Sequence, residues 1–281
     1  MSSLRTILSI QPGQPASDGA GVRLTRVFGG QGMERFDPFL MLDEFGSENP
    51  GDYIAGFPPH PHRGFETITY MLEGRMRHED HLGNVGLLGN GGVQWMTAAR
   101  GIIHSEMPEQ EEGLMRGFQL WLNLPGKDKL GEPGYRDIPA SEIPRVQTAK
   151  GVEVVVIAGQ FDDGQVQQAG VVQRPHTEPQ LFDLHLGAGS EIAPRLPEGH
   201  RAMLYVYDGR IELDGREVPA GRLVRLSDEG QLQLASAQGA NVLLLAGKPL
   251  REPIVQYGPF VMNSREEIEQ ALRDFRDGTF A

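Results

Sequence analysis

The chain has 281 residues and a net charge of −12, and its 39% hydrophobic and 23% charged residues make a globular core feasible. The lack of cysteine excludes disulfides, thiolate nucleophiles and Cys-ligated zinc or iron–sulfur centres. The acidic balance disfavours direct binding to nucleic acid or anionic lipid. Because no apolar run reaches the length of a signal peptide core or a membrane span, we expect a soluble, cytoplasmic protein.

The first half of the chain has the pattern of short strands. Between residues 23 and 124, apolar stretches such as 67–72 and 93–97 alternate with Gly, Pro, Asp and Asn. Stretches of this length and spacing predict a β-sandwich or small barrel rather than alternating strands and helices.

Two polar pairs stand out within this half. His60 and His62 flank Pro61, which favours an extended chain, and residues i and i+2 of an extended segment share a face. His104 and Glu106 have the same spacing. Three imidazoles and a carboxylate suit a divalent first-row metal ion. The alternative is that these histidines only form hydrogen bonds within their strands.

Other polar residues of this half have simpler interpretations. His78 and His81 precede the turn residues 82–84, which predicts an exposed hairpin end, with a second metal site as the alternative. Glu66 follows His62 by four residues and could be a ligand, an acid/base group or a support for a ligand. The isolated histidines are predicted to be surface or hydrogen-bonded residues, and they are His176, His185 and His200.

Residues 125–145 contain four prolines and many charges, which predicts a connection over the surface. A second series of β-like stretches then begins at Val152. Residues 66–76 align with residues 201–211, so that Gly74 falls on Gly209, which indicates an internal repeat. We therefore predict two domains, residues 1–145 and residues 146–281.

The repeat also makes a prediction about the second domain. The same offset places Arg195 at the position of His60 and Pro197 at the position of His62. The second barrel would then lack the metal ion and serve a structural or binding role.

The end of the chain predicts one amphipathic helix. Ser264 and Glu267 form a capping box, and Gly278 is a stop signal. The apolar stripe consists of Ile268, Leu272 and Phe275. We expect this helix to pack on the body of the protein, with docking of a partner as the alternative.

Longer blocks of sequence surround these residues. They are residues 37–45 (DPFLMLDEF), 60–67 (HPHRGFET), 94–97 (QWMT), 98–108 (AARGIIHSEMP), 120–123 (LWLN), 249–253 (PLREP) and 257–263 (YGPFVMN). With these blocks the chain strongly resembles the pirin family, a branch of the cupin superfamily, over almost its whole length. The resemblance implies an all-β bicupin, with two stacked cupin (double-sheet jelly-roll) barrels and a C-terminal helix.

The resemblance also implies one metal ion in the N-terminal barrel. The ligands carried over are His60, His62, His104 and Glu106. Iron is the usual ion, although the same donors accept Ni, Mn, Co, Cu or Zn. Glu66 stands where many cupins keep a metal-binding Glu. Its spacing to Gly74 departs from the general cupin pattern, however, and pirins take their carboxylate from the later pair.

Bacterial relatives that resemble this chain are described as quercetin 2,3-dioxygenases, which open a flavonol with O₂ and release carbon monoxide. If the chain has this activity, Glu106 is both a ligand of the metal ion and the catalytic base that takes the proton of the flavonol 3-hydroxyl. The residues expected to line the opening above the metal ion are Phe45, Phe57, Arg63 and Met96. We expect a monomer that takes a small aromatic substrate and O₂.

Two non-enzymatic alternatives come from the same resemblance. Animal relatives are regarded as iron-dependent transcription co-regulators, and some bacterial pirins are thought to regulate a metabolic enzyme by direct binding. Either role would use a protein partner rather than nucleic acid, because the chain is acidic.

Overall fold

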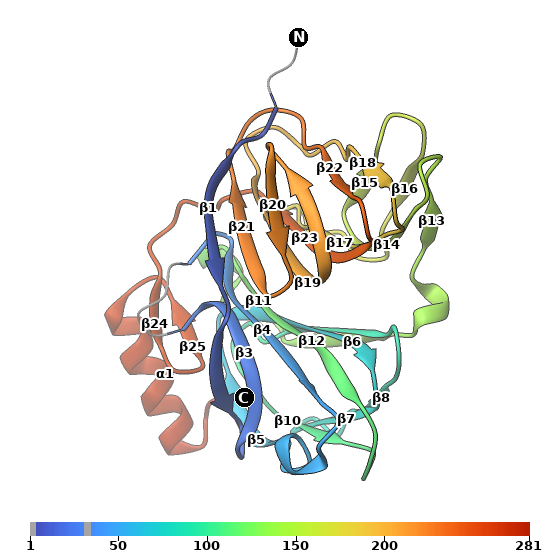
Figure 1. Cartoon of the computed structure of the whole chain (residues 1–281). Coiled ribbons are helices and arrows are strands. Elements are labelled where there is room, and N and C mark those ends of the chain that lie inside the picture. The colour runs from blue at the N-terminus through green and yellow to red at the C-terminus, as the bar shows by residue number, and fades with distance from the viewer. Residues whose placement is uncertain (1–3, 31–34) are drawn as a thin grey trace. The chain divides into compact units, whose positions relative to one another are not determined.

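The computed structural model describes residues 4–30 and 35–281, and strands dominate both ranges (Figure 1). The described residues form two compact units. The N-terminal unit comprises residues 14–140 and 250–281, and the C-terminal unit comprises residues 4–13 and 141–249. The predicted all-β fold with a C-terminal helix is confirmed.

The N-terminal unit is built from two antiparallel sheets. Their strands are β2 (Gln14–Asp18), β3 (Val22–Gly29), β4 (Phe39–Ser47), β5 (Phe57–His62), β6 (Phe65–Glu73), β7 (Met76–Asp80), β8 (Val85–Leu88), β9 (Val93–Thr97), β10 (Ile102–Pro108), β11 (Met115–Asn123) and β12 (Gly134–Ile138). The larger sheet has the order β12-β9-β6-β11-β4-β3-β2, and the smaller has the order β5-β10-β7-β8. Two sheets that share one core are typical of a jelly roll.

The C-terminal unit is built around one extended sheet. Its strands are β1 (Ile7–Pro12), β13 (Arg145–Gln147), β14 (Val152–Ala158), β15 (Gln160–Asp162), β16 (Gln167–Ala169), β17 (Gln180–Leu186), β18 (Ser190–Ile192), β19 (Arg201–Leu213), β20 (Arg216–Pro219), β21 (Arg222–Leu226), β22 (Leu234–Ser236) and β23 (Ala240–Gly247). The main path is β1-β21-β19-β23-β17-β14-β13. Alternate side chains fill its core: Phe182, Leu184 and Leu186 of β17 meet Val154 and Val156 of β14.

The two units differ from the predicted domains at both ends of the chain. β1 pairs with β21, with Ile10 opposite Val224, so the first described strand extends the sheet of the C-terminal unit (Figure 1). The last segment instead belongs to the N-terminal unit, where the carboxylate of Asp37 accepts the backbone N–H of Leu250 and of Arg251. Local periodicity cannot predict that each terminal segment belongs to the other unit, because these contacts join residues far apart in the sequence.

Residues 125–145 are more structured than predicted. They contain β12, an edge strand that pairs with β9, between the 3₁₀ turns η2 (Gly126–Asp128) and η3 (Ala140–Glu142). The strand is only five residues long and is bounded by Pro133 and Pro139. The sequence pattern therefore predicts a loop here rather than a strand.

The predicted helix is α1 (Arg265–Asp277), which follows the hairpin of β24 (Val255–Tyr257) and β25 (Phe260–Met262). Its capping box is present, with Ser264 Oγ accepting from the N–H of Glu267 and Glu267 Oε2 accepting from the N–H of Ser264. Ile268 is buried as predicted, whereas Leu272 and Phe275 remain 38% and 43% exposed. In the described part of the chain, no helix has the length and apolar character of a membrane span.

Candidate metal centre

Three of the predicted ligands meet where β5 and β10 pair. His60 lies opposite His104 in the register, and His62 lies opposite Ile102. β5 contains three prolines and lies at the edge of its sheet, where proline is tolerated. Ligand nitrogens of His60, His62 and His104 all lie within 4.8 Å of one another. The prediction that these imidazoles converge is confirmed.

The ring nitrogens of this histidine group are divided between protein contacts and free positions. His60 Nδ1 lies 2.8 Å from the carbonyl oxygen of Pro58, which can only accept, so Nε2 of His60 is left as a ligand atom. His104 Nδ1 lies 3.4 Å from His78 Nδ1, and His104 Nε2 has no hydrogen-bond partner among the described residues.

His62 is even less satisfied by the protein. Its side chain is 3% exposed, and within the described ranges neither ring nitrogen makes a hydrogen bond of normal geometry. Buried polar atoms without partners are costly, and each one in a native protein requires an explanation. A metal ion held by the histidine group would bind one ring nitrogen of His62 and Nε2 of His104, so the residues present fit a metal ion.

The electrostatics favour the ligand form of the imidazole. Burial holds the pKa of His62 and the pKa of His104 well below the usual histidine value, and neighbouring imidazoles lower both further. The two rings are therefore neutral at pH 7. Metal binding requires neutral imidazole, so no proton has to be displaced from these rings.

Glu106 lies in the same cavity but outside the group of atoms within 4.8 Å. The β5–β10 register shifts between His104 and Glu106. The Glu106 carboxylate faces two polar side chains instead: Oε1 lies 2.9 Å from Thr69 Oγ1, and Oε2 lies 3.3 Å from Gln119 Nε2. The side chain is only 4% exposed. Its ligand role therefore stays a prediction, whereas its place on the wall of the same cavity is observed.

Glu66 faces away from the histidine group. Thr69 lines the cavity, and a residue three positions away on the same strand points to the opposite face of the sheet. Glu66 Oε1 instead accepts a hydrogen bond of 2.6 Å from Thr97. The ligand and acid/base alternatives for Glu66 are not supported by this position.

His78 is the residue that sequence reasoning missed. It was expected at an exposed hairpin end, yet it is 2% exposed and its ring centroid lies 4.7 Å from that of His104. It shares a face of β7 with buried Met76, two residues earlier, and this spacing was the available signal. His81 does lie at the turn, where its Nδ1 accepts from the N–H of Ile103.

A cavity of about 960 Å³ opens beside the histidine group. Polar side chains of Thr69, Glu106 and Gln119 lie on its wall together with His60 and His62. The aromatic and methionine side chains of the wall are Met41, Phe45, Phe57, Met76, Trp121 and Tyr257. A concave site with apolar walls and a few polar groups is the usual form of a small-molecule site.

Phe45 and Phe57 line this cavity as predicted, but Arg63 and Met96 do not. Arg63 follows His62 on an extended chain and so points away, where it donates to Asp274 and to the carbonyl oxygen of Phe280. Met96 is fully buried against Ala98, Ile102 and Tyr135.

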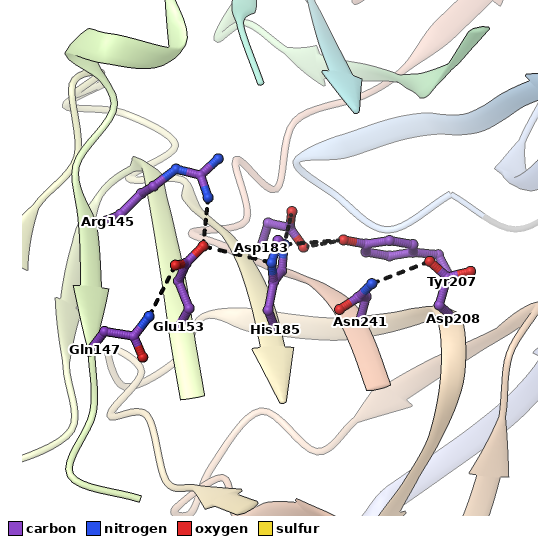
Figure 2. Close-up of polar contacts among 8 residues, drawn as sticks. All are labelled: Arg145, Gln147, Glu153, Asp183, His185, Tyr207, Asp208 and Asn241. Atoms are coloured by element: carbon purple, nitrogen blue, oxygen red, sulfur yellow. Dashed lines mark hydrogen bonds and ion pairs between the residues drawn. The ribbon is translucent and has the colours of Figure 1, made fainter. Parts of the chain in front are cut away.

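The C-terminal unit holds a polar cluster of its own (Figure 2). His185 Nε2 lies 2.7 Å from Asp183 Oδ2, and the hydroxyl of Tyr207 donates to Asp183 Oδ1 at 2.7 Å. His185 Nδ1 faces Glu153 Oε1 at 3.8 Å. The hydrogen bond to Asp183 raises the pKa of His185. His185 is thus a hydrogen-bonded histidine, as the sequence predicts.

Comparison with known proteins agrees with this fold. A family model described as Pirin matches residues 21–122, and one described as Pirin C-terminal cupin domain matches residues 181–281. The chain is 69% identical over 284 residues to a Pseudomonas aeruginosa protein named "Putative quercetin 2,3-dioxygenase", with 100% of both chains covered.

Solved structures with a similar fold include two bacterial proteins. Quercetin 2,3-dioxygenase from Acinetobacter baumannii has a TM-score of 0.91 at 32% identity, with 99% of each chain covered. A bacterial pirin from Escherichia coli in complex with nickel(II) has a TM-score of 0.65 at 21% identity, covering 89% of this chain and 99% of that one, which is a likeness of fold alone.

Proposed function

Because the chain belongs to the pirin family, we propose that it is a metal-dependent dioxygenase that opens a flavonol such as quercetin with O₂ and releases carbon monoxide. The observation that carries the proposal is the histidine group. His62 and His104 have buried nitrogens without partners among the described residues, and His60 and His62 line a cavity with aromatic walls. The names of the relatives supply the reaction class.

In this proposal His60, His62 and His104 hold one divalent metal ion, with Glu106 as the fourth ligand. Iron is our proposal for the ion, and Ni, Mn, Co, Cu or Zn would suit the same donors. When bound, the ion supplies Lewis acidity that lowers the pKa of the flavonol 3-hydroxyl.

The protein's own residues have two tasks in this reaction. The Glu106 carboxylate receives the 3-hydroxyl proton, and the side chains of Thr69 and Gln119 hold it in place. Phe45, Phe57 and Trp121 offer flat apolar surfaces that stack with the flavonol rings and exclude water from reactive species.

The test is turnover of quercetin in air by metal-loaded protein, with flavonol absorbance and carbon monoxide both followed. His104→Ala is expected to abolish turnover and to lower the metal content. The matched control is His81→Ala, which removes a histidine from the nearby turn and is expected to leave turnover unchanged. Metal-loaded wild-type protein that consumes no quercetin would refute the proposal.

One feature favours a second candidate, a regulator that binds a protein partner. Leu82, Val85 and Leu87 are 58%, 56% and 68% exposed at the β7–β8 hairpin, and β8 is the edge strand of its sheet. Exposed apolar groups on an edge strand are typical of an interaction surface. Under this candidate Leu87→Lys would weaken partner binding, whereas under the dioxygenase proposal it would leave turnover unchanged.

A further inference from the structure

The end of the chain contacts the residue that directly follows the proposed ligand His62. Residues 256–259 of the β24–β25 hairpin line the same cavity as His60 and His62. They overlap the block 257–263 that the sequence singles out and that the proposed metal centre does not use. The hairpin and the helix after it therefore lie at the site without an assigned role.

The described protein groups hold the His62 ring only loosely. Neither ring nitrogen makes a hydrogen bond of normal geometry with them, and the ring meets Phe65 and Trp121 edge-on, at centroid distances of 5.2 and 5.4 Å. Burial lowers the pKa of His62, and the carbonyl group of Pro259 opposes this shift. Metal-bound histidines are usually oriented by a hydrogen bond from the second ring nitrogen. The orientation of His62 therefore depends on packing and on where its backbone is held.

Backbone hydrogen bonds attach the residue after His62 to the hairpin. The N–H of Arg63 donates to the carbonyl oxygen of Pro259 at 3.2 Å, and the N–H of Val261 donates to that of Arg63 at 3.0 Å. Gly64 has φ +90°, and a Cβ there would lie 2.0 Å from the carbonyl oxygen of Val261. Only glycine permits this close approach.

A buried ammonium closes the same junction. Lys129 Nζ donates to the carbonyl oxygens of Gly64 at 2.7 Å and Val261 at 2.9 Å, and the Lys129 side chain is 1% exposed. Lys129 therefore joins the backbone just after the ligand-bearing strand to the hairpin.

The side chain of Arg63 makes a second attachment, to α1 and the residues that follow it. Its Nη1 donates to Asp274 Oδ2 at 2.6 Å, and its Nη2 donates to the carbonyl oxygen of Phe280 at 2.8 Å. The guanidinium carbon also lies 4.3 Å from the centre of the Phe280 ring. Arg63 is only 5% exposed, and a buried charge is costly unless it is paired. The pair with Asp274 therefore fixes where this side chain can lie.

We propose that Arg63 is a positioning residue of the metal centre, which holds the backbone from which His62 reaches the metal ion. His62 and Arg63 are consecutive on an extended chain and point to opposite sides, so ligand and attachment share one short piece of backbone. Asp274 and Phe280 hold the guanidinium, which makes the C-terminal segment part of the metal-binding structure. The inference rests on the proposed function for the metal ion and not for the reaction.

The test is binding of Co²⁺ to the full chain freed of metal, measured by competition with a chelator and by the visible absorption of bound Co²⁺. We expect Arg63→Met to weaken Co²⁺ binding about 10–100-fold, the usual effect of removing a group that orients a ligand. The absorption bands of the loaded variant should also shift, because a displaced His62 changes the ligand geometry. Chemical denaturation of the metal-free proteins measures stability separately, since a merely structural role would change stability and leave the affinity and the spectrum unchanged.

A second variant approaches the same contact from α1. Asp274→Ala removes a partner that is 22% exposed, so it replaces Arg63→Met if that variant does not fold. It should weaken Co²⁺ binding about 3–10-fold, the value of about one hydrogen bond, because Phe280 still accepts from the guanidinium. The double variant should lose no more affinity than Arg63→Met alone, because both substitutions act through one contact.

The matched control is Asp277→Ala, which removes the exposed partner of Arg276 from the same helix. Its Co²⁺ affinity should equal that of wild type. A loss as large as that of Asp274→Ala would overturn the role of Arg63, because the effect would then come from any acidic residue at this end of α1.

The remaining outcomes distinguish the two proposals. Wild-type affinity and spectrum in Arg63→Met, or in Asp274→Ala if Arg63→Met does not fold, would overturn the positioning role even if the variant is less stable. Weaker Co²⁺ binding in these variants, in a protein that never consumes quercetin, would refute the dioxygenase and support the positioning residue. A wild-type protein that binds no Co²⁺ would overturn both.

Discussion

At the scale of single residues, His78 affects the orientation of His104 as a proposed metal ligand. With Nε2 of His104 free as a ligand atom, its Nδ1 proton points at His78 Nδ1, 3.4 Å away. Metal-bound histidines usually direct this proton at a carboxylate or a backbone carbonyl. At 3.4 Å the contact with His78 is long for a hydrogen bond, so the orientation of His104 depends on the packing of His78 as well as on the hydrogen bond.

His78→Leu should therefore weaken metal binding while all the proposed ligands remain. We expect a loss of about 10–100-fold in affinity, the usual effect of removing a group that orients a ligand. Competition with a chelator measures it. His81→Asn, at the exposed turn, is the control, and equal affinity in His78→Leu and wild type would contradict the prediction.

Glu106→Gln keeps the size of the side chain and removes its basic carboxylate. Metal should be partly retained while turnover falls about 10²–10⁴-fold, the usual contribution of a positioned base. Metal occupancy and kcat are measured together, with Glu66→Gln as the control on the opposite face of β6. Full turnover in metal-loaded Glu106→Gln would exclude the base role.

His185 makes the stability of the C-terminal unit depend on pH. Asp183 raises its pKa in the folded state, so the stabilising effect is complete below the unfolded pKa of about 6.5 and is lost as pH rises through the folded value. Urea unfolding of wild type and His185→Gln should differ more at about pH 5.5 than at about pH 8.5. A difference that is independent of pH would argue against this linkage.

At the scale of elements, the junction between the end of β5 and the C-terminal hairpin depends on Lys129. Burial lowers the pKa of Lys129 to about 8, which still leaves the ammonium mostly charged at pH 7. Its three acceptors are the carbonyl oxygens of Gly64 and Val261 and the side-chain oxygen of Asn123.

Lys129→Met would leave these three buried acceptors without their donor. We expect the free energy of unfolding to fall by about 3 kcal/mol or more, because each of the three unsatisfied buried polar groups costs at least about 1 kcal/mol and the apolar stem is retained. Chemical denaturation measures the change. Lys127→Met, at an exposed position two residues earlier, should have little effect, and equal losses in the two variants would disprove the assignment.

Local patterns predicted the elements that have a clear period. The sequence predicts that His60 and His62 share a face, and it predicts the capping box of α1, because each pattern lies within a few residues. β12 was not predicted, because short edge strands between prolines have no clear hydrophobic period. Arg63 was misplaced although the alternation of an extended chain puts it on the face opposite His62. Only its partners Asp274 and Phe280, at the other end of the sequence, lie beyond a local pattern.

At the scale of the whole molecule, the exchanged ends make each unit discontinuous in sequence. The proposed ligands lie between residues 60 and 106, yet residues 250–281 complete the same compact unit. The predicted boundary between residues 145 and 146 would leave the N-terminal part without its hairpin and α1.

Removal of residues 250–281 should therefore abolish metal binding although every proposed ligand remains. The exposed carbonyl oxygens and the uncovered cavity wall would destabilise the N-terminal unit. Removal of residues 1–13, which takes β1 from the C-terminal unit, should leave the metal content near that of wild type. Metal analysis of both truncated proteins checks this, and full metal content without residues 250–281 would contradict it.

The late position of the β24–β25 hairpin in the sequence also determines when the N-terminal unit can fold during translation. Chains emerge from the ribosome N-terminus first, so the proposed ligands appear long before residues 250–281. The N-terminal unit can reach its final form only after residues 141–249 have been translated and residues 250–281 have left the ribosome. A metal ion would then be retained by chains that include residues 250–281 and not by chains terminated before them, so metal content would report on the translation of this segment.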